Sequence, residues 1–237
     1  MRILAALLLL LALTATLHAT EKPNVLFIAI DDMNDWTTLF NPENPIQTPN
    51  LVKLAKRGCF FSQAYCAVPG CNPSRTAILT GYYPTTSGVY NNGQSWRALV
   101  PDVVTLPQYF RQQGGYTALG AGKIFHHGHT GADRKDNPSF NEFFKMRIHS
   151  GKPAKNLNGF KVRPLASSAF DWGELEAEKH TDEHTVEWVC DKMKTFPKDK
   201  PLFLAAGIFR PHLPFWAPPS GRTGRRVPGG ARWGWES

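Results

Sequence analysis

Runs of apolar residues predict two strands that are buried on both faces. Residues 24–30 and residues 202–208 lack the polar alternation that a half-exposed strand would have. A shorter strand is predicted over residues 116–120. Continuous apolar strands are typical of a parallel sheet that is covered by helices. The pattern therefore predicts an α/β fold.

Helices are predicted between these strands from their start and stop residues. Segments 48–58, 105–114 and 181–194 each begin at a capping Thr or Asp, and the first two end at glycine. Residues 60–67 are rich in aromatic side chains and are expected to be extended, whereas residues 82–93 are expected to form a loop. The apolar faces are expected to be Leu51, Leu54 and Ala55 in the first helix and Val186, Val189 and Met193 in the last.

Polar side chains follow the end of each predicted strand. Asp31 and Asp32 come directly after the first strand, Lys123 and His126 follow the second, and His212 follows the last. Ligands of open α/β sheets bind beyond the carboxyl ends of the strands, so these side chains are expected to converge. Adjacent carboxylates at a strand end suit a hard divalent cation such as calcium. The alternative for this pair is a helix cap or a solvated turn.

The segment 71–75 (Cys-Asn-Pro-Ser-Arg) joins a thiol, a rigid turn, a hydroxyl and a guanidinium. Pro73 favours the first turn of a helix, and Gly81 favours its end. Arg75 lies one helical turn after Cys71, so both side chains are expected to face one pocket. A guanidinium there suits a tetrahedral anion, because it binds such oxygens as a fork. The alternative is a buried or disulfide-bonded cysteine beside a helix start.

The pattern Cys-x-Pro-Ser-Arg, continued by Leu-Thr-Gly at residues 79–81, resembles the signature of the type I sulfatases. The resemblance implies an α/β sandwich like that of alkaline phosphatase, with a mostly parallel central sheet. It implies that a separate formylglycine-generating maturation enzyme oxidises Cys71 to formylglycine, whose aldehyde hydrate supplies the nucleophile. It also implies one calcium ion that is held by Asp31, Asp32 and residue 71.

Two further motifs extend this resemblance. Residues 122–126 match a Gly-Lys-x-x-His element of the family, which implies that Lys123 contacts the sulfate and that His126 contacts the formylglycine hydroxyl. Residues 211–215 (Pro-His-Leu-Pro-Phe) resemble a segment of the iduronate-2-sulfatase-like branch, which implies that His212 is the general acid. The alternative for His212 is a histidine packed between two prolines. Lys123 and Arg75 are then expected to stabilise the anionic transition state.

Composition limits the range of partners. The net charge of +8 favours anionic ligands, but no block of lysines interleaves with aromatic residues, so no nucleic-acid partner is predicted. The iduronate-2-sulfatase-like resemblance implies a sulfated sugar or polysaccharide as the substrate. Among the four cysteines, Cys59 and Cys66 are candidates for a disulfide.

The chain is expected to divide into three parts. Residues 1–19 have the pattern of a secretory signal peptide, which predicts a secreted or periplasmic protein with no stable membrane span after its removal. Residues 20–219 are expected to form the N-terminal part of a sulfatase catalytic domain, and residues 220–237 a disordered or out-of-frame tail. The second half of the family's domain supplies further calcium ligands and a lysine. The resemblance therefore implies an incomplete sandwich here.

Other functions are compatible with the same residues. A phosphonate or phosphodiester hydrolase of the same superfamily can share the Cys-x-Pro-Ser-Arg motif. A truncated sulfatase fragment would carry half of a metal site and would be inactive. A basic extracellular module would bind sulfated glycans without turnover and without a need for Cys71.

Overall fold

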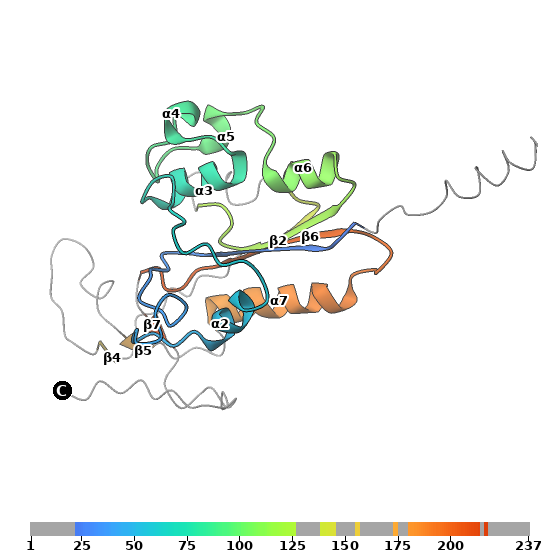
Figure 1. Cartoon of the computed structure of the whole chain (residues 1–237). Helices are drawn as coiled ribbons and strands as arrows, with labels where there is room; N and C mark the ends of the chain where they lie inside the picture. Colours follow the sequence, from blue (N-terminus) through green and yellow to red (C-terminus); the bar gives the residue numbers. More distant parts are fainter. Residues whose placement is uncertain are drawn as a thin grey trace, which may run out of the picture.

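A four-stranded parallel sheet forms the centre of the structure (Figure 1). The computed structural model describes residues 22–126, 138–145, 155–156, 173–174, 180–213 and 216–217. The strands lie in the order β1-β6-β2-β3, and each neighbouring pair is parallel. Their bounds are Val25–Ile30 for β1, Leu202–Ile208 for β6, Thr117–Gly122 for β2 and Glu142–Phe144 for β3. The α/β fold with a parallel sheet, predicted from the apolar runs, is confirmed.

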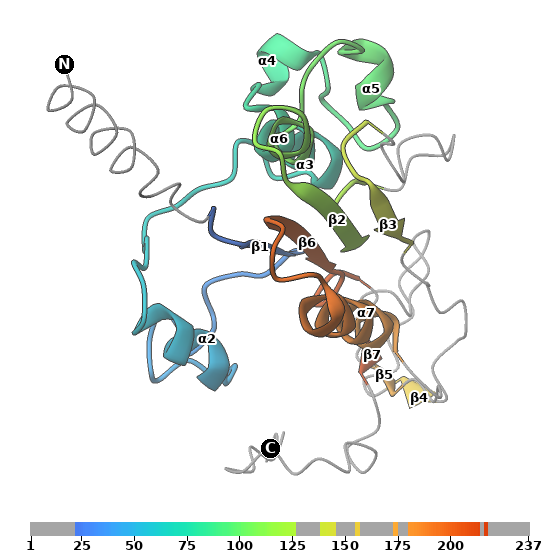
Figure 2. The same ribbon diagram turned by 90° about the vertical axis from the view of Figure 1, so that its right-hand side faces the viewer.

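Helices cover both faces of this sheet and give three layers (Figure 2). On one face lie α3 (Cys71–Thr80), α4 (Pro84–Ser87), α5 (Trp96–Leu99) and α6 (Leu106–Gln112). On the other side lie α7 (Thr181–Thr195) and, farther from the sheet, α2 (Pro49–Ala55). A second sheet has the order β4-β5-β7, with bounds Lys155–Asn156, Gly173–Glu174 and Trp216–Ala217.

Two apolar clusters pack the sheet against its helices. Toward α3 to α6, Phe203 stacks on Phe110 with ring centroids 4.7 Å apart, and Trp96 stacks on Phe125 at 5.4 Å. Toward α7, Val189 packs against buried aliphatic side chains of β2 and β6. Burial of one large apolar side chain contributes about 1.5–3 kcal/mol, so β6, which is buried along nearly its whole length, anchors both clusters.

Two glycines let β2 and β6 approach each other closely where the strands end. The backbone N–H of Lys123 donates to the carbonyl of Gly207 at 2.9 Å. Gly122 has a φ of 75°, in the left-handed region that favours glycine. A Cβ atom on Gly207 would overlap the backbone of Lys123. This approach therefore fixes where the chain leaves β2 and where Lys123 lies.

The structure differs from the sequence predictions on the outer side of β1. No residue of α2 is buried, and Leu54 is 59% exposed because the helix stands away from the sheet. Residues 60–67, which were expected to be extended, contain a turn at residues 62 and 63 and form no strand. Residues 84–87 of the predicted loop form α4, which begins at Pro84 and ends before Gly88.

α7 faces the sheet with a different line of residues from the one predicted. Val189 is buried as expected, but Val186 is 46% exposed and Met193 is 55% exposed. The buried line runs instead through Thr185 and Val189, which are four residues apart on one helical face. The short side chain of Thr185 lies against Gly122 of β2. Small residues on both elements therefore set the rotation of the helix.

Some predictions concern residues at or beyond the limits of the described chain. The signal peptide at residues 1–19 and the tail at residues 220–237 lie outside the described residues. In the part that is described, no helix has the length and apolar character needed to cross a bilayer. Cys59 and Cys66 are exposed free thiols, so the candidate disulfide is not formed.

We expect Gly207→Ala to lower the free energy of unfolding by about 3 kcal/mol, because the added methyl group must displace rigid backbone. Gly58→Ala is the matched control, since a Cβ there would meet its nearest atom at 4.0 Å. That change is expected to stay within about 0.5 kcal/mol of the parent. Urea unfolding measures both values, and equal stability of the two variants would contradict the close approach of β2 and β6.

Candidate functional site

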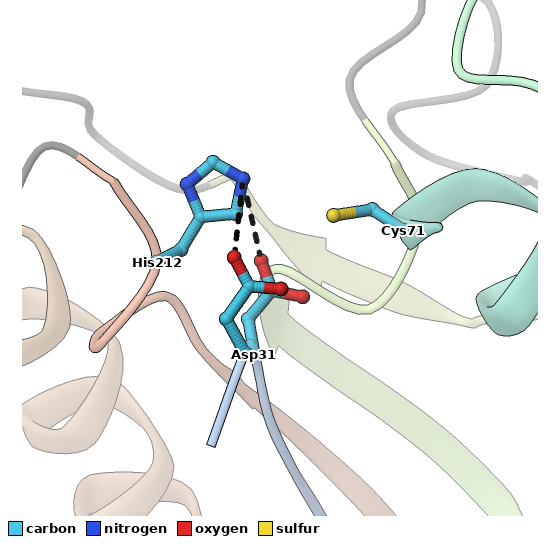
Figure 3. A group of neighbouring side chains, drawn as sticks. Asp31, Cys71 and His212 are labelled. Atoms are coloured by element: carbon cyan, nitrogen blue, oxygen red, sulfur yellow. Dashed lines mark ion pairs between the residues drawn. The ribbon is translucent and has the colours of Figure 1, made fainter. Parts of the chain in front are cut away.

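The carboxyl ends of β1, β2 and β6 bring together the polar side chains that the sequence places after each strand. Asp31 and Asp32 follow β1, Lys123 follows β2 and His212 follows β6. Cys71 is the first residue of α3 and lies across from these groups (Figure 3). The predicted convergence at one edge of the sheet is therefore present in the structure.

The chain turns sharply as it leaves β1, and the two carboxylates there differ in exposure. The N–H of Asp31 still donates to the carbonyl of Ile208 on β6 at 3.0 Å. Asp32 has a φ of 55°, a left-handed conformation that aspartate tolerates better than most residues. Asp31 is consequently buried, whereas the side chain of Asp32 is 51% exposed.

Asp31 is paired with two buried cations. Its Oδ1 atom accepts a hydrogen bond from Arg75 Nη2 at 2.7 Å, and its Oδ2 atom is paired with Lys123 Nζ. Burial by itself would raise the pKa of Asp31, but the charges and hydrogen bonds of Arg75 and Lys123 outweigh it and hold this pKa below its usual value. The carboxyl group is therefore ionised at neutral pH, and its single negative charge lies between two positive ones.

The guanidinium of Arg75 donates hydrogen bonds to groups of the protein itself. Besides Asp31, it donates from Nη1 to the carbonyls of Lys123 and of Ile124, the latter at 3.1 Å. The sequence suggested a guanidinium fork that grips an anion, but the fork here holds Asp31 and the chain beyond β2. The Nζ atom of Lys123 lies 3.9 Å from the Sγ atom of Cys71.

Cys71 is the first residue of α3, and the N-cap residue before it is Gly70, which has no side chain to cap the helix. The following residue, Asn72, is buried and ties the helix start to the loop at residues 91–94. Its backbone N–H donates to Asn92 Oδ1 at 2.9 Å, and its Nδ2 atom donates to the carbonyls of Asn91 and Gln94 at 2.9 and 2.8 Å. Sequence reasoning missed these residues, because Asn72 occupies the variable position of the motif and its partners have no pattern of their own.

The Cys71 thiol is not activated as a nucleophile. Burial raises its pKa, and the charges of Asp31 and Asp32 add to the effect, while Lys123 and Arg75 oppose it. Cysteine enzymes that attack as thiolates have a lowered pKa instead. The thiol form therefore predominates at neutral pH, and the site is poorly suited to direct thiolate catalysis.

The two histidines of the site lie in different surroundings. Burial, together with the charges of Lys123 and Arg75, lowers the pKa of His126 to about 4, so this imidazole is neutral at pH 7. His212 is partly buried, and its Nε2 atom lies 3.9 Å from one oxygen each of Asp31 and Asp32 (Figure 3). Its Nδ1 atom contacts the carbonyl of Leu213 at 2.6 Å and must donate there, because a carbonyl only accepts.

Four potential metal-ligating atoms lie close together at this site. They belong to Asp31, Asp32, Cys71 and His212, and all lie within 4.8 Å of one another. Two carboxylates suit calcium, which takes about six to eight oxygen ligands, whereas a thiol and an imidazole do not. The carboxylates therefore fit calcium as part of its shell, and an oxygen in place of the Cys71 sulfur would improve the fit.

Comparison with known proteins identifies a consistent set of relatives. A family model described as Sulfatase matches residues 23–227. A sulfatase of Formosa agariphila is 34% identical over 214 residues, covering 84% of this chain and 41% of the relative. The iduronate 2-sulfatase of Homo sapiens is 30% identical over 208 residues, covering 84% of this chain and 37% of the relative. The chain thus spans about two fifths of the length of these relatives.

Solved structures agree on the fold. The protein BT4656, solved in complex with its substrate D-glucosamine-2-N,6-O-disulfate, superposes with a TM-score of 0.58 at 21% sequence identity. The match covers 81% of this chain and 35% of that chain. This likeness supports the alkaline-phosphatase-like sandwich that was expected, with only part of that domain present in this chain.

We expect Asp31→Ala to destabilise the protein by about 3–5 kcal/mol, because it leaves Lys123 and Arg75 as buried cations without a counter-charge. Asp32→Asn is the control, since asparagine tolerates the left-handed conformation of residue 32 and the half-exposed carboxylate is expected to contribute less than about 1 kcal/mol. Both variants are unfolded in urea with a chelator present, which excludes an effect through bound metal. Similar losses for the two variants would argue against the buried ion triad.

The low pKa of His126 predicts an acid-sensitive fold. Its pKa is about 4 in the folded chain against an ordinary 6.5, so between these values the unfolded chain binds a proton that the folded chain does not. Stability should therefore fall as the pH drops from 6.5 to 4, by less than about 3.5 kcal/mol at about 1.4 kcal/mol per pKa unit. His126→Gln should flatten this part of the curve. Titration of the His126 ring protons near pH 6.5 by NMR would refute the assignment.

Proposed function

Because the chain belongs to the sulfatase family, we propose that its site hydrolyses sulfate esters. The observation that carries this proposal is the 3.9 Å separation of Lys123 Nζ from Cys71 Sγ, beside a carboxylate pair. A nucleophile precursor, an ammonium group and a cation-binding pair thus meet at one sheet edge. The reaction breaks the bond between sulfur and the alcohol oxygen, adds water, and releases the alcohol and sulfate.

Residue 71 is the proposed nucleophile after oxidation. As formylglycine it would supply a hydrated aldehyde, whose hydroxyl oxygen can displace the alcohol and whose second hydroxyl allows sulfate to leave. The raised pKa of the Cys71 thiol supports this assignment, since the unmodified side chain is a poor nucleophile at neutral pH. A formylglycine-generating maturation enzyme is therefore a proposed partner.

Lys123 is proposed to stabilise the charge that develops on the sulfate oxygens. Its ammonium group is buried and fixed by Asp31, so little reorganisation is needed when the anion arrives. Fixed donors of this kind contribute about 10²–10³-fold to a rate. Arg75 is proposed to act mainly through Asp31 and the backbone of residues 123 and 124, which its guanidinium holds in place.

The two histidines are proposed to handle protons at different stages. His212 is the candidate general acid that protonates the leaving alcohol oxygen, which contributes about 10²–10⁴-fold in comparable enzymes. His126, which is neutral at pH 7, is proposed to accept a hydrogen bond from a hydroxyl of residue 71. Their different surroundings support this division.

Asp31 and Asp32 are proposed to hold one calcium ion together with an oxygen of residue 71. The ion would supply positive charge near the sulfate oxygens. These groups provide fewer oxygens than calcium requires, so further ligands must come from elsewhere, such as water or protein outside the described residues.

A sulfated sugar is the proposed substrate class. The human relative is an iduronate 2-sulfatase, and the resemblance of residues 211–215 to that branch supports the same class here. Export to the periplasm or the exterior also belongs to this proposal and rests on the signal-peptide pattern of residues 1–19.

We expect Cys71→Ala to abolish turnover of 4-nitrophenyl sulfate by protein that is co-expressed with a formylglycine-generating enzyme. Cys190→Ala, an exposed cysteine of α7, is the matched control and should keep the parent rate. Mass spectrometry of the peptide with residue 71 measures the conversion separately from activity.

The same assay separates the rival functions. Faster turnover of an aryl phosphonate monoester than of the aryl sulfate would favour the phosphonate hydrolase. Unchanged turnover after Cys71→Ala would refute the nucleophile. Conversion of residue 71 without turnover of either ester would favour an inactive fragment.

A further inference from the structure

Asp182 makes a contact that its place at the start of α7 does not predict. The sequence suggested Thr181 or Asp182 as the cap of this helix, but the N-cap residue is His180. The carboxylate of Asp182 turns instead to the chain that leaves β6. It accepts hydrogen bonds from the backbone N–H of Phe209 at 2.7 Å and of Arg210 at 2.9 Å.

These two N–H groups belong to the segment that carries His212. The N–H of His212 donates to the carbonyl of Phe209 at 3.0 Å, and Arg210 Nη1 donates to the carbonyl of His212 at 2.6 Å. The imidazole of His212 also stacks on the ring of Phe209, with centroids 4.8 Å apart. Residues 209–212 therefore form one tight turn, and its first two residues are held by Asp182.

We propose that Asp182 is a positioning residue for His212, an inference that rests on the proposed sulfatase function. Two hydrogen bonds from neighbouring N–H groups to one carboxylate are stronger than bonds to a neutral acceptor, and they fix both the place and the direction of the chain. His212 Nε2 lies 3.9 Å from the carboxylates of Asp31 and Asp32, so a small shift of the turn would remove it from the leaving-group side. Asp182 touches no reacting atom and acts only through this turn.

The neighbouring residue Glu183 provides a matched control. Glu183 also lies in the first turn of α7, and its Oε2 atom accepts from the N–H of His180 at 2.6 Å. Removal of Glu183 takes the same charge from the same helix end as removal of Asp182. It also removes a capping contact of α7. The Glu183 carboxylate binds the helix start at His180, whereas that of Asp182 binds residues 209 and 210, so the two variants separate helix capping from the positioning of His212.

The test compares two esters that differ in the basicity of the leaving oxygen. Loss of a correctly placed general acid harms phenyl sulfate, whose leaving oxygen is basic, more than 4-nitrophenyl sulfate. We expect Asp182→Ala to lower kcat/KM for phenyl sulfate by about 10- to 100-fold and for 4-nitrophenyl sulfate by less than about 3-fold. Glu183→Ala should change both values by less than about 3-fold. Equal losses for the two esters would overturn the inference.

A double-mutant cycle tests whether the effect passes through His212. In the His212→Ala background, Asp182→Ala should cause little further loss with phenyl sulfate, because the group that it positions is already absent. Full additivity of the two losses would contradict the proposed route.

A second measurement does not depend on turnover. Hydrogen exchange of the amides of Phe209 and Arg210, followed by mass spectrometry, should speed up at least about 10-fold in Asp182→Ala and stay at the parent rate in Glu183→Ala. If neither the parent nor any variant turns over either ester, the proposed function fails, while the exchange result still tests the turn. Unchanged exchange in Asp182→Ala would overturn the inference whatever the activity.

Discussion

The buried carboxylate of Asp31 is the interaction on which the site depends. A buried ion without a partner costs several kcal/mol, and Lys123 and Arg75 would each be such an ion without Asp31. Together the three groups join the end of β1, the first turns of α3 and the end of β2. Because hydrogen bonds to the backbone at residues 123 and 124 complete the arrangement, the sheet edge and the helix cannot move independently. The electrostatic requirement thus sets the position of residue 71.

The strands and the convergence of the site were predictable from the sequence for local reasons. Burial on both faces leaves an uninterrupted apolar run, and a parallel sheet places the residues after its strands at one edge. The contacts of Asn72 and Asp182 were not predictable, because they join residues 20 and 27 positions apart with no periodic pattern. The rotation of α7 was missed for a related reason: it follows from the fit of Thr185 against a glycine on another element.

Chemically similar groups of the site lie in different surroundings. Asp31 is buried between cations, whereas its neighbour Asp32 reaches solvent through a left-handed turn. His126 is held neutral by burial and by nearby positive charge, whereas His212 sits beside two carboxylates. Separate environments for paired titratable groups are what acid and base roles require at one pH. The fold creates them by placing Asp31 and His126 beside Lys123 and Arg75, and Asp32 and His212 on turns that follow the strands.

Asn72 links the motif that carries Cys71 to a loop farther along the chain. Its side chain ties the helix start to residues 91 and 94, while the motif itself reads Cys-x-Pro-Ser-Arg whatever occupies this position. A substitution at residue 72 would therefore loosen the link between the start of α3 and this loop while leaving the Cys-x-Pro-Ser-Arg pattern intact. Because Asn72 is buried and makes three hydrogen bonds to residues 91, 92 and 94, this loop and the helix start that carries Cys71 form one mechanical unit, and a shift of either is transmitted to the other.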